Sequence, residues 1–107
     1  MAKQLYNVTV LVAHERSNEW LSYMTKEHIL DVMNTNCFES FKLNRIKFVD
    51  DKDGVTYAIQ YVAPSEQKLQ EYLEHHAPAL KKDHQDKFGE SALAFRTIME
   101  ILQESNI

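Results

Sequence analysis

The sequence contains few of the residues that brace a fold through disulfides or metal ions. Its only cysteine is Cys37, so no disulfide can form within the chain, and a zinc site built on cysteines is not expected. A single cysteine also fits a reducing compartment. No histidine motif adjoins Cys37 to activate its thiol as a nucleophile, so we expect a small, half-buried residue there.

Clustered positive charge is also absent. There are 12 Lys and Arg against 16 Asp and Glu, which gives a net charge of −4. The densest basic run is Lys81-Lys82, and Asp83 follows it directly. Because binding to phosphate backbones needs clustered cations, we expect no nucleic-acid partner.

Long hydrophobic runs are missing too. The apolar stretch near the start, "LYNVTVLVA", is too short to span a membrane and is interrupted by Asn7 and Thr9. It also lacks the cleavage pattern of an export signal. We therefore expect no membrane association and a cytoplasmic location. The 107 residues, 44% hydrophobic and 26% charged, predict one globular domain over residues 1–107.

The sequence does contain a regular succession of strand and helix patterns. Apolar residues recur at every second position in four segments, 5–13, 37–49, 55–63 and 91–102. Helical spacing runs from Ser17 or Asn18 to about Asn34, and from Ser65 to Gly89 with a break at Pro78. The order β-α-β-β-α-β predicts an α+β, ferredoxin-like sandwich. Its antiparallel four-stranded sheet has the order 4-1-3-2, with helices on one face.

Such a sheet has a second face that the helices leave uncovered. We assign the most apolar side of each strand to the helices: Val8, Val10, Val12, Phe41, Leu43, Tyr57, Ile59, Tyr61, Phe95, Met99 and Ile101. The uncovered face then carries Leu5, Asn7, Thr9, Leu11, Ala58, Gln60, Val62, Ala94, Arg96 and Ile98. This set is too apolar for an exposed face and too polar for a dry core. It predicts a homodimer whose facing sheets form a dimeric α/β barrel; the alternative is a monomer with a solvated face.

Several segments resemble a known family. "YNVTV", "KEHILDVM", "TYAIQY", "HAPALKKDHQDKFG" and "AFRTIMEIL" resemble, in this order, a bacterial family of small proteins classed as a domain of unknown function. The resemblance covers about Tyr6 to Leu102. That family is grouped with the dimeric α/β-barrel superfamily of antibiotic-biosynthesis monooxygenases, EthD-like proteins and stress-response barrel proteins. The resemblance implies the ferredoxin-like fold and a homodimer, but no catalytic residues. Leu30 departs from the family pattern, where a proline is expected, and this should affect the helix path more than any chemistry.

One candidate site lies on the first predicted helix. His28 comes four residues after Met24, so it should face the sheet. A half-buried histidine there would serve as a general base or orient a ligand carbonyl, which makes His28 the candidate catalytic residue. Related barrel enzymes that act without a cofactor have mostly apolar pockets, and Trp20 and Tyr23 would suit one. The alternative is a structural histidine bonded to a backbone carbonyl.

A second candidate site lies on the uncovered face of the sheet. Asn7, Gln60 and Arg96 are predicted to lie there on adjacent strands. An arginine flanked by amides suits a carboxylate or an enolate oxygen, so we take the three as candidate ligand-binding residues. The alternative is a hydrogen-bond network between subunits that fixes the dimer register.

Three of the five histidines fall within "EHHAPALKKDH". His75 and His76 are adjacent, and His84 follows the break at Pro78, so the spacing of a helical zinc site is absent and we expect no metal. His76 and His84 should turn inward and approach each other as candidate ligand-binding residues. His75 should point outward.

The sequence therefore predicts a small homodimer that binds a small organic ligand or a partner, without a cofactor or a strong catalytic signature. The alternative is a cofactor-independent monooxygenase-like or isomerase-like enzyme that uses His28 or Arg96 on a small organic molecule.

Overall fold

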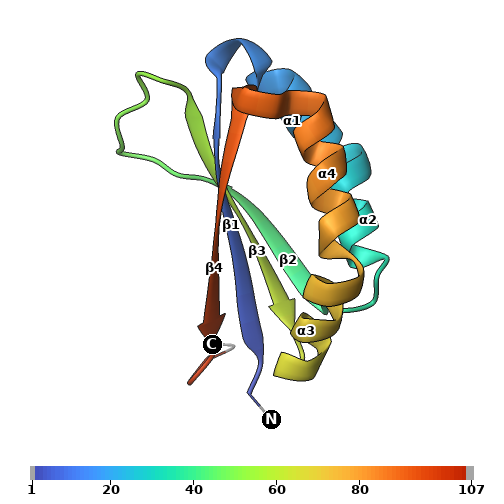
Figure 1. Cartoon of the computed structure of the whole chain (residues 1–107). Coiled ribbons are helices and arrows are strands. Elements are labelled where there is room, and N and C mark those ends of the chain that lie inside the picture. Colours follow the sequence, from blue (N-terminus) through green and yellow to red (C-terminus); the bar gives the residue numbers. More distant parts are fainter. Residues whose placement is uncertain (1, 106–107) are drawn as a thin grey trace.

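A computed structural model describes residues 2–105 of the chain. Four strands form one antiparallel sheet, and the helices lie on one side of it (Figure 1). The strands are β1 (Gln4–Val12), β2 (Ser40–Arg45), β3 (Val55–Ala63) and β4 (Ala92–Glu100). The helices are α1 (Ser17–Tyr23), a π-helical segment (Met24–His28), α2 (Ile29–Met33), α3 (Glu66–His75) and α4 (Ala77–Phe88), with short 3-10 turns at His14–Arg16 and Gly89–Ser91. This arrangement confirms the predicted ferredoxin-like fold.

The sheet has the order β2-β3-β1-β4, which is the predicted order counted from the other edge. The central strand β1 pairs along its whole length with both neighbours, so that Val8 lies opposite Ile59 on one side and Arg96 on the other. Directly opposite residues of antiparallel strands project to the same face. The register of β1 therefore decides which residues of β3 and β4 face the helices.

The helices begin and break for identifiable reasons. Ser65 caps α3, because its Oγ accepts a hydrogen bond from the Lys68 backbone N–H at 3.2 Å. Pro78 lies in the first turn of α4, where a missing N–H costs no helical hydrogen bond, and α3 and α4 therefore meet at a corner. Ser17 does not cap the first helix. Its hydroxyl instead shares a 2.6 Å hydrogen bond with the Tyr57 hydroxyl.

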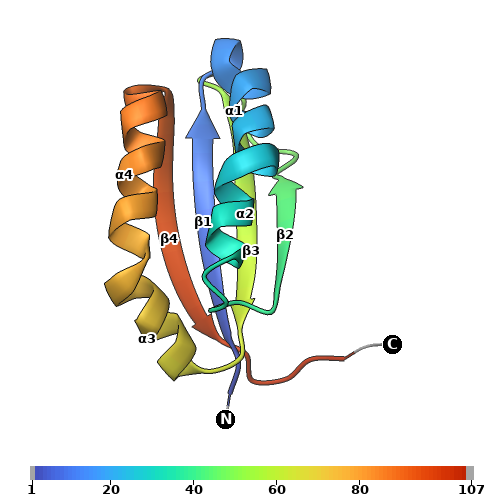
Figure 2. The same ribbon diagram turned by 90° about the vertical axis from the view of Figure 1, so that its right-hand side faces the viewer.

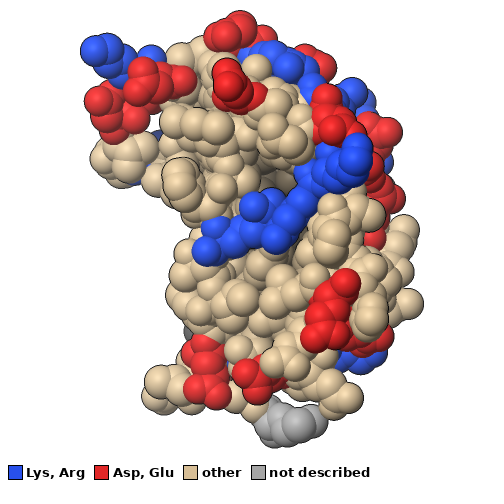
Figure 3. Space-filling model, in the orientation of Figure 1, with Lys and Arg blue, Asp and Glu red and all other residues tan. Residues whose placement is uncertain are grey.

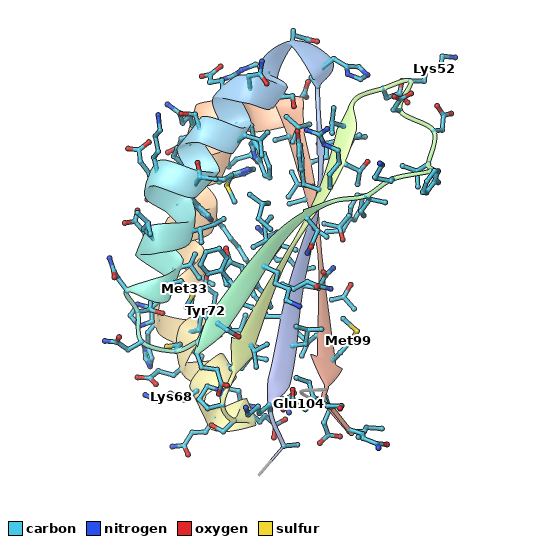
Figure 4. The ribbon with its side chains drawn as sticks, turned by 180° about the vertical axis from the view of Figure 1, so that it is seen from behind. Met33, Lys52, Lys68, Tyr72, Met99 and Glu104 are labelled. Carbon is cyan, nitrogen blue, oxygen red and sulfur yellow. The ribbon has the colours of Figure 1, made fainter. Side chains whose placement is uncertain are left out.

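The core between the two layers is aromatic. Trp20 is fully buried and stacks on Tyr57 with ring centroids 4.7 Å apart, which fixes α1 against β3. Deeper along the sheet, Tyr6 packs edge-on against Tyr72 at 5.7 Å and so joins β1 to α3. Figure 4 shows Tyr72 between the helices and the sheet and Met99 on the opposite side of the sheet.

The second predicted strand is shorter than expected. β2 covers Ser40–Arg45 only, whereas the prediction ran from Cys37 to Val49. Cys37 is completely buried in the connection before β2, not half-buried, because it is part of the hydrophobic core. After β2 the chain leaves the sheet as a long hairpin loop, in which the side chain of Phe48 is fully exposed.

The predicted faces of β4 are wrong, whereas those of β1 and β3 are confirmed. Val10 lies opposite Ala94 and Val8 opposite Arg96, so Arg96 faces the helices. The uncovered face instead carries Leu93, Phe95, Thr97 and Met99 from β4. The prediction gave the bulkier side of β4 to the helices. The structure places small residues, Ala92 and Ala94, beneath α4 and leaves the bulky side chains on the uncovered face.

Candidate functional site

The first helix presents its candidate residues through a π-helical turn. Met24–His28 adopts this wider turn between α1 and α2, and such turns occur frequently at functional sites. His28 is partly buried beneath it, and its Nδ1 lies 3.4 Å from the Tyr23 hydroxyl. Burial is the main cause that lowers the pKa of His28; Asp83 opposes this effect and Arg96 adds to it. His28 is therefore a neutral base at physiological pH.

His84 joins this group from α4. Its Nε2 accepts a hydrogen bond from Trp20 Nε1 at 2.9 Å, so the neutral ring carries its proton on Nδ1. Burial, with the charges of His28 and Arg96, lowers the pKa of His84 to about 4. The ring centroids of His28 and His84 are 5.8 Å apart. Trp20, Tyr23, His28 and His84 thus form one cluster. A shared pocket for the first three stays a prediction, because only His28 among them lines the cavity next to this cluster.

A small cavity lies next to this cluster, between the helices and the sheet. Its volume is about 30 Å³, and its lining includes His28, Lys81 and Arg96 together with three tyrosines, Tyr6, Tyr61 and Tyr72. Burial raises the pKa of all three phenols, so they remain protonated at neutral pH. The cavity has room for about one water molecule.

A much larger groove opens outward between α4 and β4. Its volume is about 620 Å³. Lys81, Lys82 and His84 line it from α4, and Ala94 and Arg96 line it from β4. Figure 3 shows a basic band that crosses this face of the molecule, from the sheet to the helix in front of it. Lys81 and Arg96 line both spaces, so they stand between the inner cavity and the groove.

The other predicted ligand-binding residues lie apart from this cluster. Asn7 and Gln60 do lie opposite each other on the uncovered face, but Arg96 does not join them, because it projects from the other side of the sheet. Asn7 Nδ2 donates instead to Thr9 Oγ1 at 3.0 Å. The predicted group of Asn7, Gln60 and Arg96 is therefore not formed within one chain.

The predicted approach of His76 to His84 is also wrong. His76 stacks on Tyr72 with ring centroids 6.3 Å apart, whereas His84 packs against Trp20, Tyr23, His28 and Phe88. Pro78 breaks the helical run, so that α4 turns away from α3 (Figure 2) and the two histidines have different neighbours. His75 is exposed, as predicted.

Sequence reasoning missed the tyrosines and Lys81. Tyr61 was assigned to the helix-facing side of its strand, but only the fold shows that Tyr6 and Tyr72 meet it around a cavity. In the sequence, Lys81 stands out only as part of the densest basic run, Lys81-Lys82, which does not indicate a site. Within residues 2–105, no group of three or more His, Cys, Asp or Glu side chains is placed to hold a metal ion. No helix in the same range is long and apolar enough to cross a membrane.

Comparison with sequence families identifies the chain. Residues 3–102 match the family described as domain of unknown function DUF4286. The chain belongs to this family. The search of curated proteins gives no match for this DUF4286 protein.

Solved structures share the fold of the DUF4286 chain at low sequence identity. An EthD family protein from Bacillus halodurans is 17% identical, with a TM-score of 0.69 over 95% of this chain and 100% of that chain. SnoaB, a cofactor-independent oxygenase from Streptomyces nogalater, is 15% identical, with a TM-score of 0.68 over 100% of both chains. A dimeric ferredoxin-like protein from an uncultured marine organism is 12% identical, with a TM-score of 0.66 over 98% of this chain and 100% of that chain. These similarities establish the ferredoxin-like fold and no particular chemistry.

Proposed function

We propose that this protein binds a small organic molecule in the groove between α4 and β4. The observation that carries the proposal is the groove itself, about 620 Å³ in volume, with Lys81 and Arg96 at its boundary with the inner cavity. Ligand sites in proteins typically measure about 300–1,000 Å³ and combine apolar walls with a few convergent polar groups. The inner cavity is too small for a ligand body, so only one small polar group would reach past Arg96 toward His28.

Substitution of Ala94 tests the site. Ala94 lines the groove, and Ala94→Leu would fill part of it. Compounds found by ligand-observed NMR from a library of small organic molecules should lose binding to Ala94→Leu. They should keep binding to Ala79→Leu, because Ala79 is exposed on α4 and does not line the groove. Unchanged binding to Ala94→Leu, or no bound compound at all, would refute the proposal.

We further propose that residues 1–107 form a single domain that acts as a homodimer through the uncovered face of the sheet. This face exposes Leu93, Phe95 and Met99 of β4 beside Leu5 and Leu11 of β1. Apolar surface of this kind is uncommon on a monomer. One structural neighbour is described as a dimeric ferredoxin-like protein, which supports a homodimer. Light scattering tests it: a strictly monomeric mass in dilute buffer would refute it.

We propose a cytoplasmic location for the protein. The support is Cys37, which is unpaired and completely buried, as suits a reducing compartment. Cell fractionation with an antibody against the chain tests this location, and recovery of the protein outside the cytoplasm would contradict it.

A second candidate function is proton transfer without a cofactor, and the environment of His28 favours it. A neutral, half-buried imidazole beside the positive charge of Arg96 suits a general base whose product is an enolate. In this step a C–H proton of the ligand moves to a ring nitrogen of His28. Its return to another carbon of the same molecule would complete an isomerisation. SnoaB, which has the same fold, is described as a cofactor-independent oxygenase.

Hydrogen–deuterium exchange at carbon tests the second function. Bound compounds with an acidic C–H should exchange it in D2O faster when the protein is present. His28→Gln should abolish the acceleration, whereas His75→Gln, at an exposed histidine, should leave it intact. Equal acceleration by both variants would exclude His28 as the base while leaving the ligand site itself in place.

A further inference from the structure

The lining of the groove between α4 and β4 differs in charge from the rest of the molecule. The chain has more acidic than basic residues, 16 against 12. The groove is lined by three cations, Lys81, Lys82 and Arg96, and by no Asp or Glu. The inner cavity likewise has Lys81 and Arg96 in its lining and no carboxylate. The charge of the groove lining is therefore opposite to the net charge of the chain.

Two of these cations have no protein counter-ion. Within residues 2–105, neither Lys81 nor Arg96 forms an ion pair, whereas Lys82 Nζ lies 2.6 Å from an Asp86 carboxylate oxygen. Arg96 projects from the helix-facing side of β4 opposite Val8, and its guanidinium interacts with the Tyr6 hydroxyl. An arginine held over a cavity without a carboxylate presents hydrogen-bond donors that a ligand oxyanion would satisfy.

The positive field of Arg96 extends over the surrounding groups. Its charge lowers the pKa of Lys81, which burial also lowers, and adds to the burial effects on His28 and His84. It also opposes the rise in the pKa of Tyr6 that burial causes. These effects share one sign, because a positive charge lowers the pKa of each neighbouring group. Asp83 does influence His28, but it does not line the groove.

Most of the remaining lining of the groove is apolar. Pro78 lines it from α4 beside the polar His84 and Gln85, while Ala92, Leu93, Ala94 and Phe95 supply the β4 side. The two alanines leave space beneath α4 that larger side chains would fill. A ligand that fits these walls has an apolar body, and its polar group faces Arg96.

We infer that the groove takes a small organic anion, whose carboxylate or enolate oxygen is held by Arg96 and Lys81 and whose apolar body lies along Ala92 and Ala94. This inference rests on the proposed ligand site and specifies the ligand's charge. The ligand oxygen meets the two cations at the mouth of the inner cavity, where His28 and the three phenols lie behind them.

Matched pairs of carboxylates and neutral amides test the inference. The probes are benzoate and benzamide, 2-naphthoate and 2-naphthamide, and indole-3-acetate and indole-3-acetamide. Each is titrated into the full-length protein in low-salt buffer near neutral pH, and the backbone amide NMR signals of residues 92–96 are followed. Bound carboxylates should bind at least about tenfold more tightly than their amides, the difference that one charge-assisted hydrogen bond supplies.

Substitutions at the two cations should remove this preference. Arg96→Gln and Lys81→Gln should weaken the carboxylates toward the affinity of the amides and leave the amides unchanged. Arg96→Lys, which keeps the charge, should retain part of the preference. The matched controls Arg45→Gln and Lys26→Gln, at exposed positions outside the groove, should behave as the unaltered protein. The dispersion of the amide spectrum confirms that each variant is folded.

The outcomes separate this inference from the proposed function. Equal affinity of acids and amides, unaffected by Arg96→Gln, would overturn the anion inference and leave the ligand groove standing. No shift of any groove signal by any of the six compounds would count against both. Inorganic phosphate has no apolar body. If it binds as tightly as the best carboxylate, the inferred contribution of the apolar body to binding is wrong; weaker binding of phosphate supports that contribution.

Discussion

Trp20 Nε1 donates a hydrogen bond to His84 Nε2 at 2.9 Å and thereby ties α1 to α4 across the top of the core. The bond requires an unprotonated Nε2, because a protonated imidazole has no acceptor nitrogen. Trp20 is also stacked on Tyr57, so its indole has little freedom to move away. Protonation of His84 would therefore place two donors against each other in a buried site.

This contact predicts that stability falls with acidification. His84 has a pKa of about 4 when folded and an ordinary pKa of 6.5 when unfolded. Above pH 6.5 neither state binds the proton; as the pH falls from 6.5 toward 4, only the unfolded state does, and the folded state is destabilised. Urea unfolding should show a loss of roughly 2–3 kcal/mol over this range, because one pKa unit corresponds to about 1.4 kcal/mol.

His84→Gln separates this contribution from that of His28, whose pKa is lowered in the same direction. On acidification, the variant should lose less stability than the unaltered protein. Part of the loss should remain, because His28 still contributes. His75→Gln, at an exposed histidine, should keep the whole loss. An undiminished loss in His84→Gln would show that another group is responsible.

The two glycines predict unequal costs on substitution by alanine. A Cβ at Gly54 would collide with the Val12 carbonyl oxygen, where the β3 hairpin end approaches β1. At Gly89 the backbone is left-handed, with φ +52°, but a Cβ would have no neighbour within 4 Å. Gly54→Ala should cost roughly 3 kcal/mol and Gly89→Ala about 1–2 kcal/mol. Chemical unfolding of the two variants checks the order, and a larger cost at Gly89 would contradict it.

The cap of α3 predicts a smaller, local effect. Ser65 Oγ accepts from the Lys68 backbone N–H, so Ser65→Ala leaves that donor without its partner. The expected loss of unfolding free energy is about 1 kcal/mol. Ser22→Ala, at an exposed position within α1, should change stability by less than about 0.5 kcal/mol. Equal losses would show that the Ser65 hydroxyl is not a stabilising cap.

The fold was predictable because its signals are local. Alternation in β1 and β3 and the break at Pro78 each specify an element independently of tertiary contacts. The ends of β2 were not predictable in this way, because Cys37 and Phe38 are apolar and buried although they lie outside the strand. Alternating hydrophobic residues indicate which positions are buried. A buried loop next to a strand therefore gives the same sequence pattern as the end of the strand.

The faces of β4 show where the pattern fails. When only one face is buried, the more apolar side of a strand identifies it. In β4 the bulky set of Leu93, Phe95 and Met99 lies on the uncovered face, while Ala92 and Ala94 admit α4. From the sequence alone, Arg96 is therefore assigned to the same face as Asn7 and Gln60. The groove between α4 and β4, which Arg96 lines, cannot be predicted from that assignment. The His28 group was easier to predict, because helical spacing places Trp20, Tyr23 and His28 on neighbouring parts of one helix.

The apolar side of β4 leads to the last prediction, which concerns assembly. Phe95 is 68% exposed in the isolated chain and lies opposite Thr9, midway along the edge strand β4 on the uncovered face. If two such faces pack together, a carboxylate at this position would be buried without a partner, at a cost of several kcal/mol. Phe95→Glu should therefore shift the protein to a monomer by light scattering, while the backbone keeps its fold by circular dichroism.

Leu30→Glu provides the matched control. Leu30 is 49% exposed, but it projects from α2 on the other side of the molecule, so its replacement should leave the mass unchanged. A dimer that survives Phe95→Glu and is lost in Leu30→Glu would place the interface on the helices. Leu93 and Phe95 belong both to the uncovered face and to the groove lining, so an interface on that face would cover part of the β4 wall and leave the α4 side of the groove accessible to ligand.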